Sequence, residues 1–418
     1  MGDGEHERGW EMANMIDNGR RLLAVGSILV LGLLVACGTG SSSGGGTGSN
    51  ANCNTSQPTQ GVTSSQITLG ETLPLTTAGP SPQQTVDGSQ AYYDMINAAG
   101  GVKGRKIKLI ARDDQYNPSM ALQQMRNLVQ QDKIFAVAGG QGTPNFLAQA
   151  PFLNTQAVPA IAPYAPSSEL GNMKYPHVYM TSVNYITEFQ IMTRRVLDNF
   201  SPKGFGLVGV QGNVGDDSKQ GMKQAIGSSG KPLLYIPEQP GTPDLTPIAT
   251  QLKSSGADWV FLILTPSDTG GLLKAMQRIG YQPRLAAWAG MSDQTYIDQF
   301  GDLSQGMIVA QELALPDASD PDVQKYVQQF TKQTGRAPSG FNNSLGWSQA
   351  ELTVKALQDA PALTRSCVEY ALNQVKDFKT GILPPITFGA SERQGVNAVG
   401  LVQIEGKTVK QIASFKSV

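Results

Sequence analysis

From residue 66 onward, short apolar segments alternate with segments of helical periodicity, and this alternation constrains the fold more than any other feature. The clearest strand–helix pairs are residues 205–210 with 216–228, 233–236 with 245–254, and 259–264 with 268–279. The strand segment WVFLIL (259–264) is apolar throughout, as expected of a strand buried on both faces. The alternation therefore predicts an α/β fold with parallel sheets and helices on both faces.

Three further features refine this expectation. Asn117-Pro118 is a good N-cap followed by a first-turn proline, so a helix should begin there. The last hundred residues change pattern, with helices expected at 320–334, 344–359 and 365–378 and two strands at 399–404 and 408–415. A chain of 418 residues is longer than one ordinary domain, so two lobes are expected.

The N-terminal region has the pattern of an export signal. Arg20-Arg21 precede an apolar stretch at 22–34, whose length of about 13 residues suits a signal peptide, whereas a membrane span needs about 18 or more. The motif LVAC (34–37) resembles a bacterial lipoprotein cleavage site, which implies a signal peptide at 1–36 and a diacylglyceryl group on Cys37. A short single-pass anchor is the alternative. The acidic first 19 residues leave Met1, Met12 and Met15 as possible starts.

Residues 37–62 are rich in Gly, Ser and Thr, and we expect them to form a flexible tether. The formal net charge of −1 provides no basic surface for nucleic acid. After removal of His6 with the signal peptide, His177 would be the remaining histidine, and we interpret it as structural. Asp113 and Asp114, adjacent at a strand end, should point to opposite faces. With no P-loop, no G-x-S-x-G motif and no metal-ligand spacing, the sequence predicts neither an enzyme nor a cofactor or metal site.

The block NAAGGVKGRKIKLIARDDQYNPSMALQQMRNLVQQDKIFAVAGG (97–140) resembles the branched-chain amino-acid (Leu/Ile/Val-binding) type of periplasmic solute-binding protein. The segments VPAIAPYAPSSEL, VGVQGNVGDDS and QGVNAVGLVQIEGKTVK extend the resemblance to the C-terminus. The resemblance implies a two-lobed type I periplasmic-binding-protein fold with hinge crossings near 181–183, 312–316 and 395–397. The lobes would comprise 63–182 with 315–395 and 183–314 with 396–418.

The resemblance also implies the function. With the lipoprotein motif, the chain would be an extracytoplasmic receptor that captures a small ligand between its lobes and delivers it to the permease of an ABC importer. Its location would be the outer face of the bacterial cytoplasmic membrane, held there by lipid on Cys37. The alternative is a lipoprotein receptor that presents its ligand to a signalling partner.

Several positions correspond to ligand-binding residues of the family. In amino-acid-binding members, hydroxyl and backbone N–H groups of the first lobe hold the ligand carboxylate. The loop GGQGTP provides such groups, and a helix should begin at its Thr143-Pro144. The full set of candidate ligand-binding residues is Ser81, Gln141, Gly142, Thr143, Tyr164, Ala165, Asn213, Val214, Thr265, Ala289 and Gly290.

The second lobe departs from the amino-acid binders. Ala289 stands where they have the carboxylate that holds the ligand ammonium, and a buried ammonium without a counter-charge is costly. We therefore expect a small organic acid, amide or similar compound without a free α-amino group. An amino acid remains the alternative if Asp293 or another acid reaches the site; Trp288 and Tyr164 are candidate apolar walls.

Two cysteines remain after Cys37. In an exported protein, Cys53 and Cys367 are more readily explained as a disulfide than as free thiols. The resemblance places both in the first lobe, where a bridge would attach the segment that precedes the first strand. Two unrelated small residues are the alternative.

Overall fold

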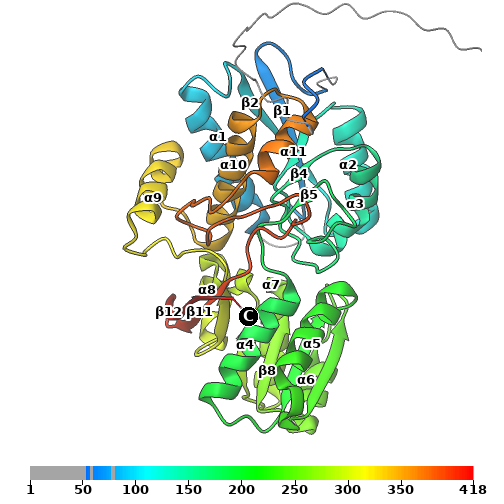
Figure 1. Ribbon diagram of the computed structural model, residues 1–418. Helices are drawn as coiled ribbons and strands as arrows, with labels where there is room; N and C mark the ends of the chain where they lie inside the picture. Colours follow the sequence, from blue (N-terminus) through cyan, green and yellow to red (C-terminus); the bar gives the residue numbers. More distant parts are fainter. Residues whose placement is uncertain (1–52, 57–59, 77–80, 418) are drawn as a thin grey trace, which may run out of the picture. The chain divides into compact units, whose positions relative to one another are not determined.

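The computed structural model describes residues 53–56, 60–76 and 81–417. The predicted signal peptide, Cys37 and most of the predicted tether lie outside these residues. The described chain contains two sheets, each with helices on both faces (Figure 1).

The first sheet has five strands in the order β2-β1-β3-β4-β5, and every pairing is parallel. Its strands are β1 (Gln66–Leu73), β2 (Lys106–Asp113), β3 (Ala136–Ala138), β4 (Ala160–Ile161) and β5 (Val178–Tyr179). The helices that accompany it are α1 (Ser81–Ala98), α2 (Pro118–Gln130), α3 (Thr143–Thr155), α9 (Pro321–Thr334), α10 (Phe341–Asp359) and α11 (Arg365–Asn373).

The second sheet has seven strands in the order β12-β11-β10-β9-β8-β6-β7. Its strands are β6 (Phe205–Val210), β7 (Leu233–Glu238), β8 (Trp259–Ile263), β9 (Arg284–Ala287), β10 (Ile308–Gln311), β11 (Val399–Glu405) and β12 (Thr408–Lys416). Its helices are α4 (Tyr185–Asn199), α5 (Asn213–Ile226), α6 (Thr246–Ser255), α7 (Pro266–Arg278) and α8 (Gln294–Phe300), with short 3-10 turns η1 (Gly227–Ser229), η2 (Ala289–Ser292) and η3 (Gly301–Leu303).

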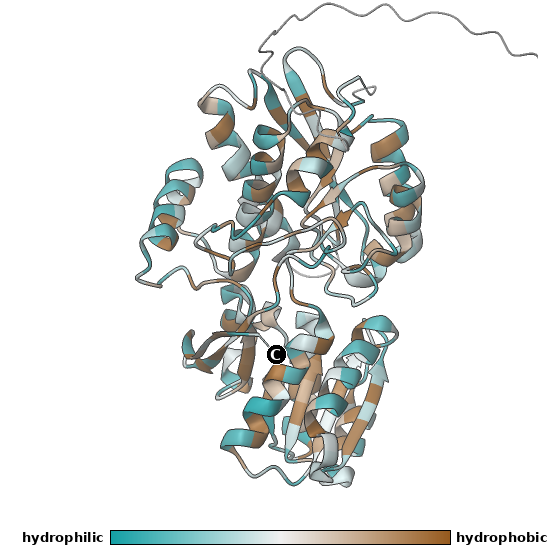
Figure 2. Cartoon of the chain, viewed as in Figure 1, coloured by the Kyte–Doolittle hydropathy of each residue, from teal (hydrophilic) through white to brown (hydrophobic). Residues whose placement is uncertain are grey.

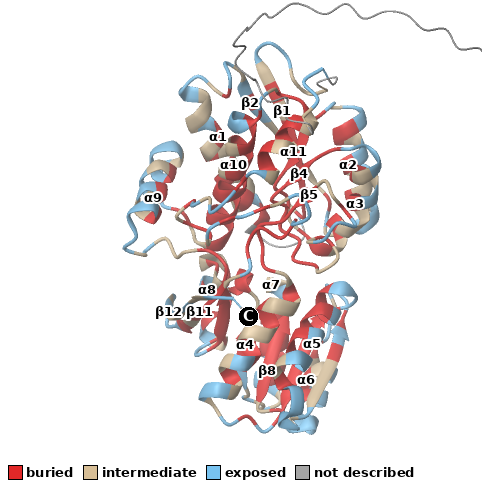
Figure 3. Ribbon diagram, in the orientation of Figure 1, coloured by how far each residue is buried: buried red, intermediate tan, exposed pale blue. Residues whose placement is uncertain are grey.

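Strand β8 illustrates why the apolar runs become central strands. All five of its residues are buried, and alternate side chains belong to different clusters. Val260 and Leu262 pack in the cluster that contains α6 and α7 residues, whereas Phe261 and Ile263 pack with α4 and α5. Successive side chains of a strand point to opposite faces, so a strand covered on both sides has no polar face. Figures 2 and 3 show β8 as hydrophobic and buried.

The prediction that each lobe has a parallel sheet is wrong for the last two strands. β11 runs antiparallel to β10, and β12 runs antiparallel to β11. Residues 406–407 are all that separates β11 from β12, and a connection this short permits only an antiparallel hairpin. Gly406, with φ of 62°, provides the left-handed conformation that this turn requires.

Most helix positions follow the sequence prediction, and the differences lie at the ends. Asn117 caps α2 as predicted, since its side chain accepts hydrogen bonds from the backbone N–H groups of Ser119 and Met120. Helix α10 begins at Phe341 rather than 344, directly after Gly340, whose φ is 121°. Helix α11 ends at Asn373 rather than 378, because Phe378 pairs with Ile386 in a short bridge.

The chain passes between the sheets three times: after β5, after β10 and before β11. The crossings expected near 181–183, 312–316 and 395–397 fall in these connections. Strands β1–β5 lie within 63–182, β6–β10 within 183–314, and β11 and β12 within 396–418. This distribution agrees with the lobe boundaries, which remain predictions.

Cys53 and Cys367 form a disulfide, the pairing that the sequence predicts. Cys367 is buried in the first turn of α11, and Thr364, the N-cap of that helix, donates a hydrogen bond from Oγ1 to the Asn54 backbone O at 2.9 Å. The segment that precedes β1 is therefore attached to a helix that lies 314 residues further along the chain.

Candidate ligand-binding site

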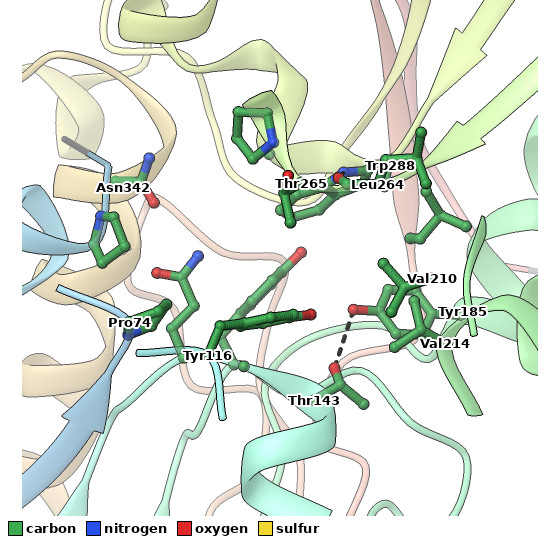
Figure 4. Close-up of a pocket in the computed structure, with 17 residues that line it drawn as sticks. Pro74, Tyr116, Thr143, Tyr185, Val210, Val214, Leu264, Thr265, Trp288 and Asn342 are labelled. Atoms are coloured by element: carbon green, nitrogen blue, oxygen red, sulfur yellow. Dashed lines mark hydrogen bonds between the residues drawn. The ribbon is translucent and has the colours of Figure 1, made fainter. Parts of the chain in front are cut away.

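A pocket lies where the loops that follow strands of the two sheets meet (Figure 4). Pro74 follows β1, Tyr116 follows β2, Val210 ends β6 and Leu264 follows β8. In open parallel sheets, ligands bind outside these carboxyl ends of the strands. The complete lining is Pro74, Pro82, Tyr116, Gln141, Gly142, Thr143, Tyr164, Tyr185, Val210, Val214, Ile263, Leu264, Thr265, Pro266, Trp288, Gly290 and Asn342.

The pocket has room for several water molecules. It offers about 80 Å³ to the centre of a water molecule, and one water needs roughly 10–15 Å³ by the same measure. Most lining side chains are apolar or aromatic, with a few hydroxyl and amide groups between them. Pockets of this composition bind small organic molecules and orient them with a few polar contacts.

The loop between β3 and α3 brings the polar groups. Gly139, Gly140 and Gly142 have φ values of 86°, 94° and 124°, which only glycine adopts without strain. Helix α3 then begins at Thr143 with no side chain capping its first N–H groups. Thr143 Oγ1 lies 3.1 Å from the Tyr185 hydroxyl, the contact drawn in Figure 4. An uncapped helix N-terminus beside a hydroxyl group favours an anion such as a carboxylate.

The loop after β4 contributes Tyr164, which belongs to an aromatic group. The Tyr164 ring lies 5.4 Å from the ring of Phe341 and 6.2 Å from that of Trp288, measured between ring centres. Gly142 N–H donates to the Tyr164 carbonyl at 3.1 Å, and Tyr164 N–H donates to the Gly140 carbonyl at 2.9 Å. The two first-sheet loops are therefore joined by backbone hydrogen bonds.

The second sheet contributes a mainly apolar wall. Val210, Val214, Ile263 and Leu264 line it, and Trp288 Nε1 donates to the Leu264 carbonyl at 2.9 Å, which fixes the indole. Thr265 caps α7 and donates to Asp268 Oδ2 at 2.7 Å. In Figure 4, Thr265, Leu264 and Trp288 lie across the pocket from Tyr116 and Thr143.

Neither Ala289, the position predicted to correspond to the ammonium-holding carboxylate of the amino-acid binders, nor its neighbour Gly290 offers a carboxylate to the pocket. A Cβ on Gly290 would lie 2.2 Å from the Trp288 ring, so the indole occupies that space. Ala289 is fully buried, and its N–H donates to Glu188 Oε1 at 3.1 Å. Asp293 does not reach the pocket either, because its carboxylate caps α8 and accepts two hydrogen bonds from Asn342.

Two buried carboxyl groups lie behind the pocket, at the connections between the sheets. Glu188 is in the first turn of α4, and Glu312 directly follows β10 and accepts a hydrogen bond from the Val183 backbone N–H. Burial raises the pKa of Glu188 to about 8. Burial and the charge of Glu188 raise the pKa of Glu312 well above its ordinary value. Neither glutamate lines the pocket.

The structure brings together seven of the candidate residues in the pocket: Gln141, Gly142, Thr143, Tyr164, Val214, Thr265 and Gly290. Ala165, Asn213 and Ala289 do not line it. Ala165 is buried in the core beside Leu170, and exposed Asn213 donates through Nδ2 to Glu169. Helix α1 begins at Ser81, whose side chain lies outside the described part of the structure.

Sequence reasoning missed Pro74, Pro82, Tyr116, Tyr185, Val210, Ile263, Leu264, Pro266 and Asn342. Most of these residues lie at the end of a parallel strand or within the next few positions, so that rule could have found them. No local signal marks Tyr185 or Asn342, because α4 and α10 reach the pocket from other parts of the chain.

The other residues that the sequence analysis considered, His177, Asp113 and Asp114, do not line the pocket. His177 pairs through Nδ1 with Glu369, away from the pocket, which fits the structural role predicted for it. Asp113 accepts a hydrogen bond from Thr76 Oγ1, whereas Asp114 is buried, so the two side chains diverge as predicted. Among the described residues there is no cluster of three potential metal ligands, and none of their helices is long and apolar enough to cross a bilayer.

Comparisons with known proteins agree with this architecture. Residues 66–408 match the periplasmic binding protein family. The Leu/Ile/Val-binding protein homolog 3 of Brucella melitensis biotype 1 is 27% identical over 248 residues, which covers 58% of this chain and 67% of the relative.

Two solved structures are similar in fold. A fatty acid ABC transporter substrate-binding protein from Thermomonospora curvata has a TM-score of 0.80 and 19% identity, covering 87% of this chain and 95% of that one. A branched-chain amino acid ABC transporter from Thermus thermophilus with bound valine has a TM-score of 0.77 and 18% identity, covering 84% and 97%. The chain belongs to the periplasmic binding protein family, whose members bind solutes rather than catalyse reactions.

Proposed function

We propose that this protein binds a small organic acid without a free α-amino group and delivers it to an ABC import permease. One observation carries the choice of ligand: among the described residues, none that lines the pocket has a charged side chain. A ligand ammonium would lose its hydration without gaining a counter-charge, at a cost of several kcal/mol.

The pocket offers more favourable contacts to a ligand carboxylate than to a ligand ammonium. The uncapped N-terminus of α3 and the Thr143 hydroxyl lie at one side of the pocket. Helix α5 also begins without a side-chain cap, and its Val214 lines the pocket. Val210, Ile263, Leu264 and Trp288 then suit an aliphatic or aromatic body. Of the two structural neighbours, one is a fatty acid transporter's substrate-binding protein and the other contains bound valine, so the fold is compatible with both kinds of ligand.

Matched pairs of ligands test the proposal. Calorimetric titration of the purified protein with isocaproate and leucine, and with isovalerate and valine, compares molecules that differ in the α-amino group. We expect each deaminated acid to bind at least about a hundredfold more tightly, as several kcal/mol of unpaired charge requires. Micromolar or tighter binding of leucine or valine would contradict the choice of ligand and leave solute binding intact.

The membrane anchor is a separate part of the proposal. We propose that diacylation of Cys37 holds the protein on the outer face of the cytoplasmic membrane, since two acyl chains anchor stably where one does not. The substitution Cys37→Ser should release the protein into the soluble fraction and abolish a diacylglyceryl mass on the mature N-terminus. Unchanged processing and membrane association in this variant would refute the anchor.

A further inference from the structure

The pocket loops of the first sheet rest on two buried side chains from distant parts of the chain. Gln349, in the middle of α10, donates through Nε2 to the Gly140 carbonyl at 3.2 Å and to the Ala162 carbonyl at 2.9 Å. Glu71, in β1, accepts the Gly140 N–H on Oε2 at 3.1 Å. Glu71 is 0% exposed and Gln349 1% exposed, so water replaces neither contact.

Each of these side chains leaves one buried oxygen without a partner. Glu71 Oε1 and Gln349 Oε1 both lack hydrogen-bond partners among the described residues. The two side chains are neighbours, because a Cβ built on Gly139 would lie 2.7 Å from Gln349 Oε1 and 2.9 Å from Glu71 Oε2. Two acceptor oxygens without a donor in the same dry region, one of them charged, would be strongly unfavourable.

Rotating the Gln349 amide does not resolve the conflict. The rotation would direct Oε1 at the carbonyls of Gly140 and Ala162, which are both acceptors. The two carbonyls therefore fix Nε2 where it is, so Oε1 stays beside Gly139, where the Glu71 carboxyl group also lies. A proton on Glu71 Oε1 satisfies both oxygens at once, since Oε2 already accepts the Gly140 N–H, whereas the neighbouring Tyr93 hydroxyl can donate to one of them at most.

We infer that Glu71 is a neutral positioning residue that donates its carboxyl proton from Oε1 to Gln349 Oε1 and thereby holds both pocket loops of the first sheet. The Glu71–Gln349 pair then has every polar atom satisfied, and it ties β1, α10 and the two loops together. Rigid support of this kind fixes the polar groups that a ligand meets.

The surroundings of Glu71 agree with a neutral carboxyl group. Burial raises the pKa of Glu71 to about 8, and the Gly140 N–H opposes this only in part. The titratable group that faces it is the phenol of Tyr93 in α1, whose own pKa is raised by burial and by Glu71. No cation contributes to the titration of Glu71 among the described residues, so only the Gly140 N–H favours its ionised form there.

Two substitutions of Glu71 distinguish the effect of its titratable proton from the effect of the size and shape of its side chain. Glu71→Gln can accept from Gly140 and donate to Gln349 without titrating. Glu71→Met fills the space but satisfies neither neighbour. Glu351→Gln is the matched control: the pKa of Glu351 is also raised to about 8 by burial, but its charged neighbours Lys325 and Asp322 are on α9, away from the loops.

The functional consequence of this inference rests on the proposed function, because Glu71 matters to ligand binding only if the pocket binds a ligand. The inference itself can be tested without any ligand. Hydrogen exchange of the peptide 138–146, divided by its intrinsic rate, reports the loop at about pH 6 and about pH 9, on either side of the Glu71 pKa of about 8. We expect the wild-type and Glu351→Gln proteins to exchange about tenfold faster at the higher pH, whereas Glu71→Gln stays protected. Glu71→Met should exchange faster at both pH values.

A direct measurement completes the test. In protein with ¹³C-labelled glutamate carboxyl groups, the signal missing from Glu71→Gln should have the shift of a neutral carboxyl group near pH 7. A carboxylate shift there, or wild-type loop exchange that does not change with pH, would overturn the inference. Since neither readout uses a ligand, failure of the isocaproate titration would count against the proposed function and not against this role of Glu71.

Discussion

The loops of the first sheet bring hydroxyl, amide and backbone N–H groups to the pocket, whereas those of the second sheet bring mainly apolar side chains. Gln141, Gly142 and Thr143 represent the first set, and Val214 and Leu264 the second. The two sides also differ in their support. Buried polar side chains hold the first set of loops, while the second set follows directly from strands packed on both faces.

The difference indicates a division of roles. Hydrogen bonds depend on direction, so groups that orient a ligand need stiff support, and a buried polar network provides it. Apolar contacts depend on area and volume, so a packed wall can accept ligands of related shape. We expect the first-sheet side to decide which functional group is bound and the second-sheet side to decide how large its body is.

The largest expected effect concerns the carboxyl groups between the two sides. Because the pKa of Glu188 is raised from 4.5 to about 8, the folded protein keeps a proton that the unfolded chain loses above about pH 4.5. The free energy of unfolding should therefore fall as pH rises between these values, by up to about 1.4 kcal/mol per pH unit for each such group. Thermal unfolding between about pH 5 and 8 measures the slope.

Variants show which carboxyl group makes the free energy of unfolding depend on pH. Glu188→Gln should reduce the slope by the contribution of one group, because the amide does not titrate, while Glu71, Glu312 and Glu351 continue to contribute. Asp113→Asn is the control, since hydrogen bonds lower the pKa of Asp113 and its titration lies below this window. Equal stability across the window in the wild-type protein would exclude a neutral Glu188.

The next effect is confined to the first-sheet region, where the disulfide lies. Replacing both Cys53 and Cys367 by serine should lower the free energy of unfolding by about 2–5 kcal/mol, because the bridge closes a very long loop. Adding reductant should lower the wild-type midpoint to that of the variant and leave the variant unchanged. Two alkylatable thiols in the unreduced protein would rule out the bridge.

A smaller effect, on ligand affinity, is expected from a substitution in the apolar wall that the second sheet contributes. Trp288→Ala removes apolar area, which should weaken isocaproate and its amide to the same extent, by about 1–3 kcal/mol. Trp288→Phe should retain part of the affinity. If Trp288→Ala discriminated between the acid and the amide, the division of roles between the two sides would be wrong.

The smallest effect should come from the first-sheet side, and it should be selective. Thr143→Val keeps the shape but removes the hydroxyl, which should cost the acid about 1 kcal/mol more than the amide. Thr143→Ser restores the hydroxyl and should restore the preference for the acid. Calorimetry with both ligands measures each difference, and equal losses for acid and amide would remove Thr143 from carboxylate recognition.

Much of this fold could be predicted from the sequence because its signals are local. Apolar runs such as 259–264 are strands, Asn117-Pro118 begins a helix, and the glycines before Thr143 permit the loop that reaches the pocket. Each of these depends on residues that are neighbours in the chain. The antiparallel direction of β11 and β12 had a local cause as well, the two-residue turn between them, which sequence reasoning overlooked.

The tertiary structure decided which distant residues meet. Tyr185 reaches Thr143 because the chain crosses to the second sheet just before α4, and Asn342 reaches the pocket from α10. The exclusion of an acidic side chain at 290 depends on where the Trp288 ring lies, which no spacing reveals. Gln349 and Glu71 are 278 positions apart in the chain. They are neighbours because α10 packs against the first sheet. Burial and hydrogen bonding depend on which surfaces are in contact and not on the separation of residues in the sequence.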